Sequence, residues 1–376
     1  MKIIDADVTD IIDRIITTIR KAGIPCNLRS DEIVIDGEIH RFSTNGRPSD
    51  KAGWYVFFSH NNFVAGSFGD WRSGIKETFY SREIESLSPK DRSIIRQKQE
   101  EITRKIQCKK EEAKRKAVEL YKKAKPPDAK HPYVVKKGIK PIGEIKQLGN
   151  ALIIPVRDIN KNLLGLQYIY EDGDKKFLSG SSIKGNFFQI GSGFPIYICE
   201  GYATGASIYQ AIDGEGTVVI AFNAGNLKRV TEVLRKEYPE AEIIICADND
   251  QWTKGNPGKI KGEEAAKAVC AKIALPKFKD TFTKPTDFND LHVLEGLEEV
   301  RKQIEKAEYP QYIQKEREEV FKRLALLSPS EYDFIRKIAS KALGLKLSTL
   351  DKEVKARNRE AEKDNGKEDF IEQLKP

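Results

Sequence analysis

The sequence predicts an α/β protein built around a parallel β-sheet with helices on both faces. Between residues 194 and 308, short apolar runs such as IYIC, TVVIAF and EIIIC alternate with helical segments. These runs are apolar throughout rather than at every second position, which is typical of strands buried on both faces. Acidic residues follow two of the runs, at the strand end where sheets of this class bind ligands.

Composition and charge narrow the class of protein. The chain has 376 residues, of which 39% are hydrophobic and 32% charged, as in folded domains rather than in a disordered chain. No apolar run reaches the roughly 18 residues needed to cross a membrane, and the first residues are acidic where a signal peptide would be basic. We therefore expect a cytoplasmic protein without membrane segments. The net charge of +8 is compatible with nucleic-acid binding.

Five cysteines are spread along the chain without a C-x-x-C pair. Their odd number and wide spacing argue against a disulfide framework, and the missing pairs argue against a zinc ribbon. Cys199 and Cys246 lie inside apolar runs, so we expect buried thiols there. The sequence therefore predicts no zinc.

Changes in composition divide the chain into five segments. Residues 1–80 begin with an amphipathic helix pattern and continue as short alternating segments, including IVIDG and GWYVFFS, which predict a small β-rich domain. Residues 81–130 form a helical linker with one long charged helix, either a solvated spacer or a basic arm on DNA. Residues 131–193 carry further strand-like runs, residues 194–308 hold the βα alternation, and residues 309–376 are helical.

Three carboxylates at strand ends suggest a metal site. Glu200 follows the run IYIC, and Gly201 makes the turn into a helix, although a turn or capping role alone would explain this glutamate equally well. Asp248 and Asp250 follow the run EIIIC, and side chains two residues apart on an extended chain share a face. Two such carboxylates repel each other unless a cation neutralises them. Oxygen ligands on a rigid strand end suit Mg²⁺ or Mn²⁺.

Two further segments belong to the same predicted crevice. KPTDFNDLH has strand character, and we expect Asp287 to extend the acidic cluster and Asp290 to support it or to cap the next helix. The segment VVIAFNAGN places Asn223, Gly225 and Asn226 in the loop after another strand. Such a loop either lines the crevice or is an ordinary connection.

Taken in order, E-G before a helix, G-N after a strand, D-x-D and D-F-N-D closely resemble the Toprim domain of bacterial primases, type IA and type II topoisomerases and some nucleases. The string CEGYATGASIYQA is most similar to the alpha-type Toprim primases of phages, plasmids and satellite phages. Thr204 departs from the bacterial replicative primases, which carry a second glutamate there, so the number of metals stays open. The resemblance implies that Gly201 and Thr204 contact nucleotide or template. It implies a metal-binding set of Glu200, Asp248, Asp250, Asp287 and Asp290.

The region upstream resembles the RNA-polymerase subdomain that precedes Toprim in bacterial primases. Arg157, Lys176 and Lys184 match its arginine–aspartate, K-F-L and K-G segments. The resemblance implies that these cations hold the template backbone or the triphosphate. Topoisomerases lack this module, so it favours a primase.

The first segment resembles a primase zinc-binding domain that lacks its Cys/His quartet. We expect a metal-free counterpart in which Arg41, Trp54, Trp71 and Arg72 contact or stack on single-stranded template. The alternative is that both tryptophans belong to the core.

The resemblance as a whole implies a DNA primase of a phage or mobile element. It would join NTPs or dNTPs on a single-stranded DNA template, with a replicative helicase as candidate partner through the C-terminal helices. Two alternatives stay open: a Toprim-type metal-dependent nuclease, and a non-catalytic DNA-binding adaptor that recruits a helicase. The sequence leaves open whether the chain is a piece of a longer primase–helicase.

Overall fold

The computed structural model describes residues 6–46, 51–61, 63–70, 75–83, 87–343 and 345–359. They fall into two compact units. The first comprises Met1–Leu120 and Leu178–Ser182, and the second comprises Tyr121–Phe177 and Ile183–Pro376. Trp71 and Arg72, two of the residues expected to contact template, lie outside the described residues.

The first unit is built on a four-stranded antiparallel sheet in the order β1-β2-β3-β4. The strands are β1 (His40–Phe42), β2 (Gly53–His60), β3 (Phe63–Asp70) and β4 (Lys76–Tyr80). The other elements are α1 (Ala6–Lys21), the short 3-10 helix η1 (Ser30–Glu32) and α2 (Pro89–Lys123), whose last three residues belong to the second unit. The predicted amphipathic helix at the start and the predicted long charged helix are therefore confirmed.

Helices cover both faces of this sheet. Buried isoleucines of α1, among them Ile15 and Ile19, share a cluster with Tyr55 and Phe57 of β2. The neighbouring residue Phe58 instead packs in a cluster with Ala65 and with Ile95 of α2, as the alternation of side chains along a strand requires. Trp54 of β2 is also buried, so for this tryptophan the core alternative is correct.

The predicted strand IVIDG at residues 33–37 is not formed. The Val34 amide donates to the Tyr55 hydroxyl (3.2 Å) and the Gly37 amide donates to the Phe57 carbonyl (2.8 Å). A side-chain hydroxyl thus takes the place of a neighbouring strand, and the apolar alternation reflects burial of Ile33 without a ladder. In contrast, β4 lies outside the segments that the sequence predicted as strands.

The second unit contains two sheets. The first is an antiparallel meander in the order β5-β6-β7-β8. Its strands are β5 (Lys146–Leu148), β6 (Ala151–Arg157), β7 (Leu163–Tyr170) and β8 (Lys175–Phe177), preceded by the short helix α3 (Pro132–Lys136).

The other sheet is the predicted parallel one, in the order β13-β12-β10-β11-β9. All its pairs are parallel except that of β9 with β11 at one edge. Its strands are β9 (Phe188–Ser192), β10 (Ile196–Cys199), β11 (Gly216–Ile220), β12 (Ile243–Cys246) and β13 (Lys272–Ala274). The associated helices are α4 (Tyr202–Ala211), α5 (Ala224–Glu237), α6 (Pro257–Val269), α7 (Phe288–Glu295) and α8 (Leu297–Glu305).

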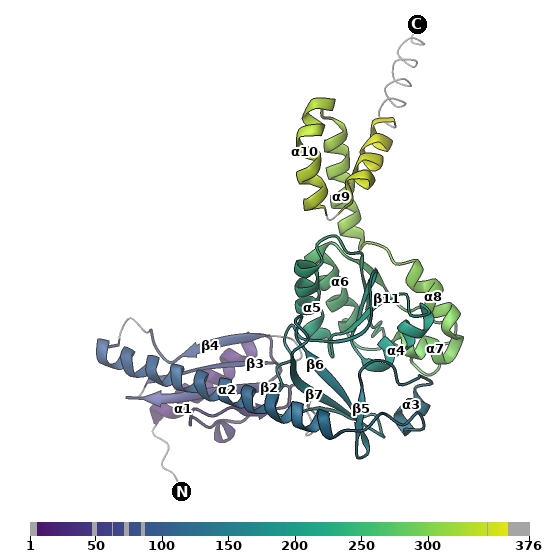
Figure 1. The fold of residues 1–376 in the computed structure, drawn as a ribbon. Helices are drawn as coiled ribbons and strands as arrows, with labels where there is room; N and C mark the ends of the chain where they lie inside the picture. Colours follow the sequence, from purple (N-terminus) through teal and green to yellow (C-terminus); the bar gives the residue numbers. More distant parts are fainter. Residues whose placement is uncertain are drawn as a thin grey trace. The chain divides into compact units, whose positions relative to one another are not determined.

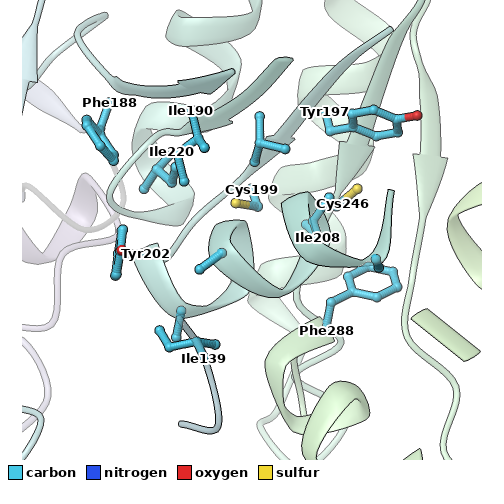
Figure 2. Packing of buried hydrophobic residues seen from close by; sticks show 14 of the residues in the cluster. Ile139, Phe188, Ile190, Tyr197, Cys199, Tyr202, Ile208, Ile220, Cys246 and Phe288 are labelled. Atoms are coloured by element: carbon cyan, nitrogen blue, oxygen red, sulfur yellow. The ribbon is translucent and has the colours of Figure 1, made fainter. Parts of the chain in front are cut away.

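Two hydrophobic clusters make this sheet the middle layer of three (Figure 1). On one face, Ile198 and Ile245 pack with Leu227 of α5 and Ala265 of α6. On the other face, α4, α7 and α8 pack over a cluster that contains Cys199, Cys246, Ile208 and Phe288 (Figure 2). The predicted α/β class with helices on both faces is confirmed, and both cysteines are buried as expected.

Three helices follow this sheet: α9 (Gln311–Ala325), α10 (Pro329–Ala342) and a helix at residues 347–359. Their shared core contains Phe321, Leu324, Leu350 and Val354. The predicted helical character of the C-terminal region is therefore confirmed as far as residue 359. Over the described parts of the chain, no helix combines the length and the apolar character that crossing a membrane requires.

Candidate active site

The carboxyl ends of β10 and β12 bring Glu200 and Asp248 to the same edge of the sheet. The two strands are parallel neighbours, with Ile198 opposite Ile245. Glu200 follows β10 directly, and Asp248 lies two residues beyond the end of β12. The crevice outside the strand ends is where open α/β sheets bind ligands, and this is the position that the sequence predicted for both residues.

Both carboxylates are buried with an oxygen that lacks a partner. Glu200 Oε1 and Asp248 Oδ1 are inaccessible and accept no hydrogen bond among the described residues. Burial raises the pKa of Glu200, and the charge of Asp250 adds to that rise. Burial also raises the pKa of Asp248, followed by the charge of Glu200. Buried carboxylates of this kind are costly unless a cation compensates them.

Asp250 lies where α6 begins. Its Oδ2 accepts a hydrogen bond from the Gly258 amide at 2.9 Å. A β-carbon on Gly258 would lie only 2.6 Å from the Asp248 carbonyl oxygen and 2.9 Å from Asp250 Oδ2. Only glycine therefore lets the first turn of α6 approach the two aspartates this closely.

Asp287 and Asp290 exchange the roles that the sequence suggested for helix capping. Asp287 is the N-cap of α7, and its Oδ1 accepts a hydrogen bond from the Asp290 amide (2.8 Å). Asp290 accepts from the Thr286 amide (2.9 Å) and lies 3.7 Å from the Lys137 ammonium. The expected strand character of this segment is wrong, because Asp287 caps a helix that begins at Phe288.

Asp287 still belongs to the acidic cluster. Burial raises its pKa, and the charge of Asp290 adds to the effect. Its charge in turn contributes to the raised pKa of Asp248 and of Glu200. Asp287 thus caps α7 and also adds its charge to the acidic cluster.

The loop after β11 brings the first turn of α5 to the crevice at the strand ends. Asn223 caps α5 by accepting from the Asn226 amide (3.1 Å), and Gly225 lies in the first turn. A backbone hydrogen bond from Ala224 to Glu200 partly offsets the rise in the pKa of that glutamate. The N-terminus of α5 therefore points its amides toward the acidic edge, where it favours anions.

Asn226 holds the segment that carries Lys184. Its Nδ2 donates to the carbonyls of Ile183 (3.0 Å), Asn186 (3.0 Å) and Ala221 (2.9 Å), and its Oδ1 accepts from the Gly185 amide (2.7 Å). Asn226 is thus a buried positioning residue, whereas Lys184 itself is exposed.

Lys175, rather than Lys176, approaches the acidic cluster. The Lys176 ammonium pairs with Asp174 at 2.9 Å and lies over the Tyr170 ring at 5.3 Å. Lys175 Nζ would be 3.6 Å from a β-carbon on Gly201. Sequence reasoning missed Lys175, and the only signal was that adjacent residues of a strand face opposite sides.

The charge state of Lys175 follows from its neighbours. Burial of the ammonium lowers its pKa, whereas the charges of Asp287, Asp248 and Glu200 act in the opposite direction. The residue as a whole is exposed, so water still reaches much of its side chain.

The remaining residues that the sequence predicted to bind nucleotide or template are Arg157 and two residues at the start of α4. Arg157 Nη2 pairs with Glu144 (2.9 Å), Nη1 donates to the Lys161 carbonyl (3.0 Å), and the guanidinium lies over the Tyr121 ring. Gly201 is the N-cap of α4, and Thr204 is buried in its first turn. In the first unit, Arg41 donates to the Lys51 carbonyl (3.2 Å).

The carboxylates fit a divalent metal that keeps water or substrate among its ligands. Within the described ranges, no three His, Cys, Asp or Glu side chains lie close enough together to hold an ion by themselves. Glu200 and Asp248 nevertheless each offer a buried oxygen without a partner. Mg²⁺ is commonly held by one or two carboxylates together with substrate phosphates and water, which matches this donor set.

Comparisons with known proteins agree with the strand-end pattern. Residues 195–298 match the Toprim domain family. A DNA primase TraC of Escherichia coli is 31% identical over 287 residues, which are 71% of this chain and 26% of that protein. A second DNA primase TraC of Escherichia coli is 28% identical over 277 residues, covering 69% of this chain and 19% of that protein. The chain thus spans about a quarter or less of these relatives.

Solved structures show weaker similarity. The primase fragment of the bacteriophage T7 primase-helicase protein is 20% identical, with a TM-score of 0.35 over 45% of this chain and 72% of that chain. A DNA primase domain from Pseudomonas aeruginosa is 14% identical, with a TM-score of 0.29 over 56% of this chain and 73% of that chain. The relationship to DNA primases therefore rests on the Toprim family match and on the two relatives found by sequence. The chain therefore has a Toprim domain at residues 195–298 and is a relative of the Toprim DNA primases of mobile elements.

Proposed function

We propose that this protein is a DNA primase that synthesises short primers on single-stranded DNA from NTPs or dNTPs. The observation that carries the proposal is the pair of buried carboxylate oxygens without partners, on Glu200 and Asp248, at adjacent strand ends of a Toprim domain. A site that concentrates unpaired negative charge is suited to metal-assisted phosphoryl transfer.

In the proposed mechanism, Glu200 and Asp248 would hold Mg²⁺ or Mn²⁺, supported by Asp250, Asp287 and Asp290. When bound, the metal would neutralise the triphosphate, activate the attacking 3′-hydroxyl and stabilise the pyrophosphate that leaves. The protein contributes the helix N-termini that begin at Gly201 and Asn223, whose amides orient phosphate oxygens.

Cations on the neighbouring elements would position the remaining substrate groups. Lys175 faces the acidic edge and is suited to hold a phosphate of the incoming nucleotide, with Thr204 behind it in α4. Lys184 and Arg157 would then contact the template strand or the triphosphate, and Lys176 the template strand. The protein would act in the cytoplasm, with a replicative helicase as partner through the C-terminal helices.

A primer-synthesis assay tests the proposal. It uses single-stranded templates, labelled NTPs or dNTPs and Mg²⁺ or Mn²⁺, and compares wild type with Asp248→Asn and Asp250→Asn. Glu242→Gln is the matched control, since Glu242 pairs with Lys272 (2.7 Å) at the opposite end of the same strand. We expect extended oligonucleotides from wild type and control and none from the two aspartate variants.

The same assay separates the alternatives. A wild-type protein that makes no oligonucleotide with any template or metal is not a primase. Metal-dependent loss of a labelled strand without product growth indicates the nuclease. Template binding that is unaffected by Asp248→Asn, with neither synthesis nor cleavage, indicates the adaptor.

A further inference from the structure

Two loops leave the parallel sheet at the same edge as Glu200 and Asp248. The first, residues 247–256, follows β12, and the second, residues 275–287, follows β13. These strands are parallel neighbours, with Cys246 opposite Ala274, so both loops begin at carboxyl ends of strands. We call the two loops together the rim of the acidic edge.

Hydrogen bonds fasten the two loops of the rim to each other. The Asn249 amide donates to the Thr286 carbonyl (2.7 Å), and Asn249 Nδ2 donates to the Pro276 carbonyl (3.1 Å). The indole Nε1 of Trp252 donates to the Pro285 carbonyl (3.1 Å). The second loop is therefore held near both of its ends, and the rim is one connected surface.

Two aromatic side chains are exposed on this rim. Phe282 is 90% exposed and Trp252 is 45% exposed. Phe282 is the second residue of a turn that the Lys284 amide closes by donating to the Thr281 carbonyl (3.0 Å). The Phe282 amide also donates to Asp280 Oδ1 (2.8 Å). Single exposed apolar residues are common on proteins, but here a fixed turn and an indole hydrogen bond hold two aromatic rings on one surface.

Lysines accompany both rings. Lys254 lies two positions after Trp252, and Lys284 lies two positions after Phe282. Both lysines are exposed, and among the described residues no carboxylate forms an ion pair with either ammonium group. Apart from the carboxylates of the acidic edge, the charged residues of the rim are Lys254, Lys277, Lys279, Lys284 and Asp280. The part of the rim that carries the rings is therefore basic.

We propose that the rim binds the single-stranded template beside the acidic edge. Bases would stack on Trp252 and Phe282, and phosphates would contact Lys254 and Lys284. Aromatic rings combined with cations are the usual means of holding single strands, since every base offers a face for stacking. The proposal deepens the proposed function and rests on it, because the bound strand is identified as the template of a primase.

The observations favour a single strand over other ligands. A free nucleotide binds in a concave pocket, whereas the Phe282 ring is almost fully exposed at the tip of a loop. The bases of a duplex stack on one another and leave no face for the ring of a side chain. A protein partner would contact the same ring as an apolar surface, and would therefore accept a leucine in its place.

Fluorescence anisotropy of the full chain with a labelled oligodeoxythymidylate tests the stacking, without added nucleotide. The variants are Phe282→Ala, Phe282→Leu and Phe282→Trp. The matched control is Phe334→Ala, which removes an 84% exposed ring from α10. We expect the Kd to rise about tenfold for alanine and for leucine, the size of one stacked base. Phe282→Trp and the control should bind like wild type, and retention by tryptophan shows that the loop still folds.

A strand of the same length with abasic sites in place of all bases separates stacking from charge. The effect of Phe282→Ala should disappear on this probe, because no base is left to stack. Lys254→Gln/Lys284→Gln should instead lower the slope of log K against log salt by about 1.4 on both probes, as for two phosphate contacts of a single strand. Lys322→Gln/Lys337→Gln, which changes exposed lysines of α9 and α10, is its control and should leave the slope unchanged.

Several results would overturn the proposal. They are wild-type affinity in Phe282→Ala, wild-type affinity in Phe282→Leu, an effect of Phe282→Ala that persists on the abasic strand, and a wild-type protein that binds neither probe. Primer synthesis measured in parallel distinguishes this failure from that of the proposed function. Synthesis by wild type with unaltered binding in Phe282→Ala rejects the rim alone. Binding that depends on Phe282 without any synthesis rejects the primase and leaves the rim as a single-strand site.

Discussion

The two principal sheets of this protein are both well buried, but they differ in whether their buried polar atoms have hydrogen-bond partners. The sheet β1–β4 and the parallel sheet of the second unit both have central strands that are buried on both faces. In the described residues of the first unit, every buried side-chain polar atom has a hydrogen-bond partner. In the second unit, Glu200 and Asp248 end their strands with buried oxygens that have none. Strands that are packed in a similar way thus support a stable framework in one unit. In the other unit they hold buried carboxylate oxygens that have no hydrogen-bond partner.

Replacement of Asp248 by asparagine should separate activity from stability. We expect primer synthesis to fall by about 10³-fold or more, because the site loses a charge where metal would bind. The free energy of unfolding at neutral pH should stay the same or increase, because repulsion among buried carboxylates is relieved. Denaturant titration and the primer assay check both expectations.

Glu242→Gln is the control for that variant, since it removes a paired carboxylate from the other end of β12. Residual activity above one tenth of wild type in Asp248→Asn would contradict the contrast between the sheets. So would a clear loss of stability in that variant.

A substitution in the sheet β1–β4 should instead lower the stability of the protein without acting on the acidic site. A β-carbon on Gly66 would lie 2.0 Å from the Val56 carbonyl oxygen and 2.8 Å from the Phe57 α-carbon, so backbone has to move. We expect Gly66→Ala to lower the free energy of unfolding by about 3 kcal/mol. Gly46 has a positive φ (+78°) but nothing lies within 4 Å of a β-carbon there, so Gly46→Ala should cost only about 1 kcal/mol.

Denaturant midpoints followed by tryptophan fluorescence compare the two glycine variants. Equal midpoints would mean that the central strands β2 and β3 can separate to admit a methyl group. The picture of a tightly packed scaffold would then be wrong.

Asn226→Ala should affect both stability and nucleotide binding. The side chain is 4% exposed and makes the four hydrogen bonds to the segment around Lys184 and to Ala221. Leaving those groups unpaired should cost about 2 kcal/mol. Thermal unfolding measures the loss, and the KM for nucleotide should rise because the segment is no longer positioned. A rise in KM without loss of stability would make Asn226 a direct ligand instead.

The smallest contrast concerns two adjacent lysines. Lys175→Met should raise the KM for nucleotide about tenfold, since it removes a cation next to the acidic edge. Lys176→Met, which breaks a surface pair with Asp174 and a contact with the Tyr170 ring, should change the KM for nucleotide less than twofold. Steady-state primer synthesis with varied nucleotide compares them. Equal effects would show that β8 does not fix which lysine faces the crevice.

Features with a long-range pattern could be predicted from the sequence. The apolar runs predicted the parallel sheet, and the position of Glu200 and Asp248 after them predicted one acidic edge. Cys199 and Cys246 were expected to be buried because they lie inside those runs. In each case the periodicity of burial determines the side that a residue faces.

Features that depend on a single neighbour could not be predicted. Whether Lys175 or Lys176 faces the acids depends on the register of a three-residue strand. Asp287 and Asp290 follow each other so closely that only the hydrogen bonds show which one caps α7. The segment at residues 33–37 alternates like a strand, yet it is held by a tyrosine hydroxyl.

The burial of Cys199 and Cys246 has a consequence for chemical labelling. Both thiols are inaccessible, and burial raises the pKa of each, so neither forms the reactive thiolate readily. Cys108, in contrast, is exposed on α2. A maleimide dye added briefly at neutral pH should therefore attach first to Cys108 in the first unit, more slowly to the half-buried Cys270, and should leave Cys199 and Cys246 unmodified. The native sequence thus offers a handle for fluorescence work without removal of the buried cysteines.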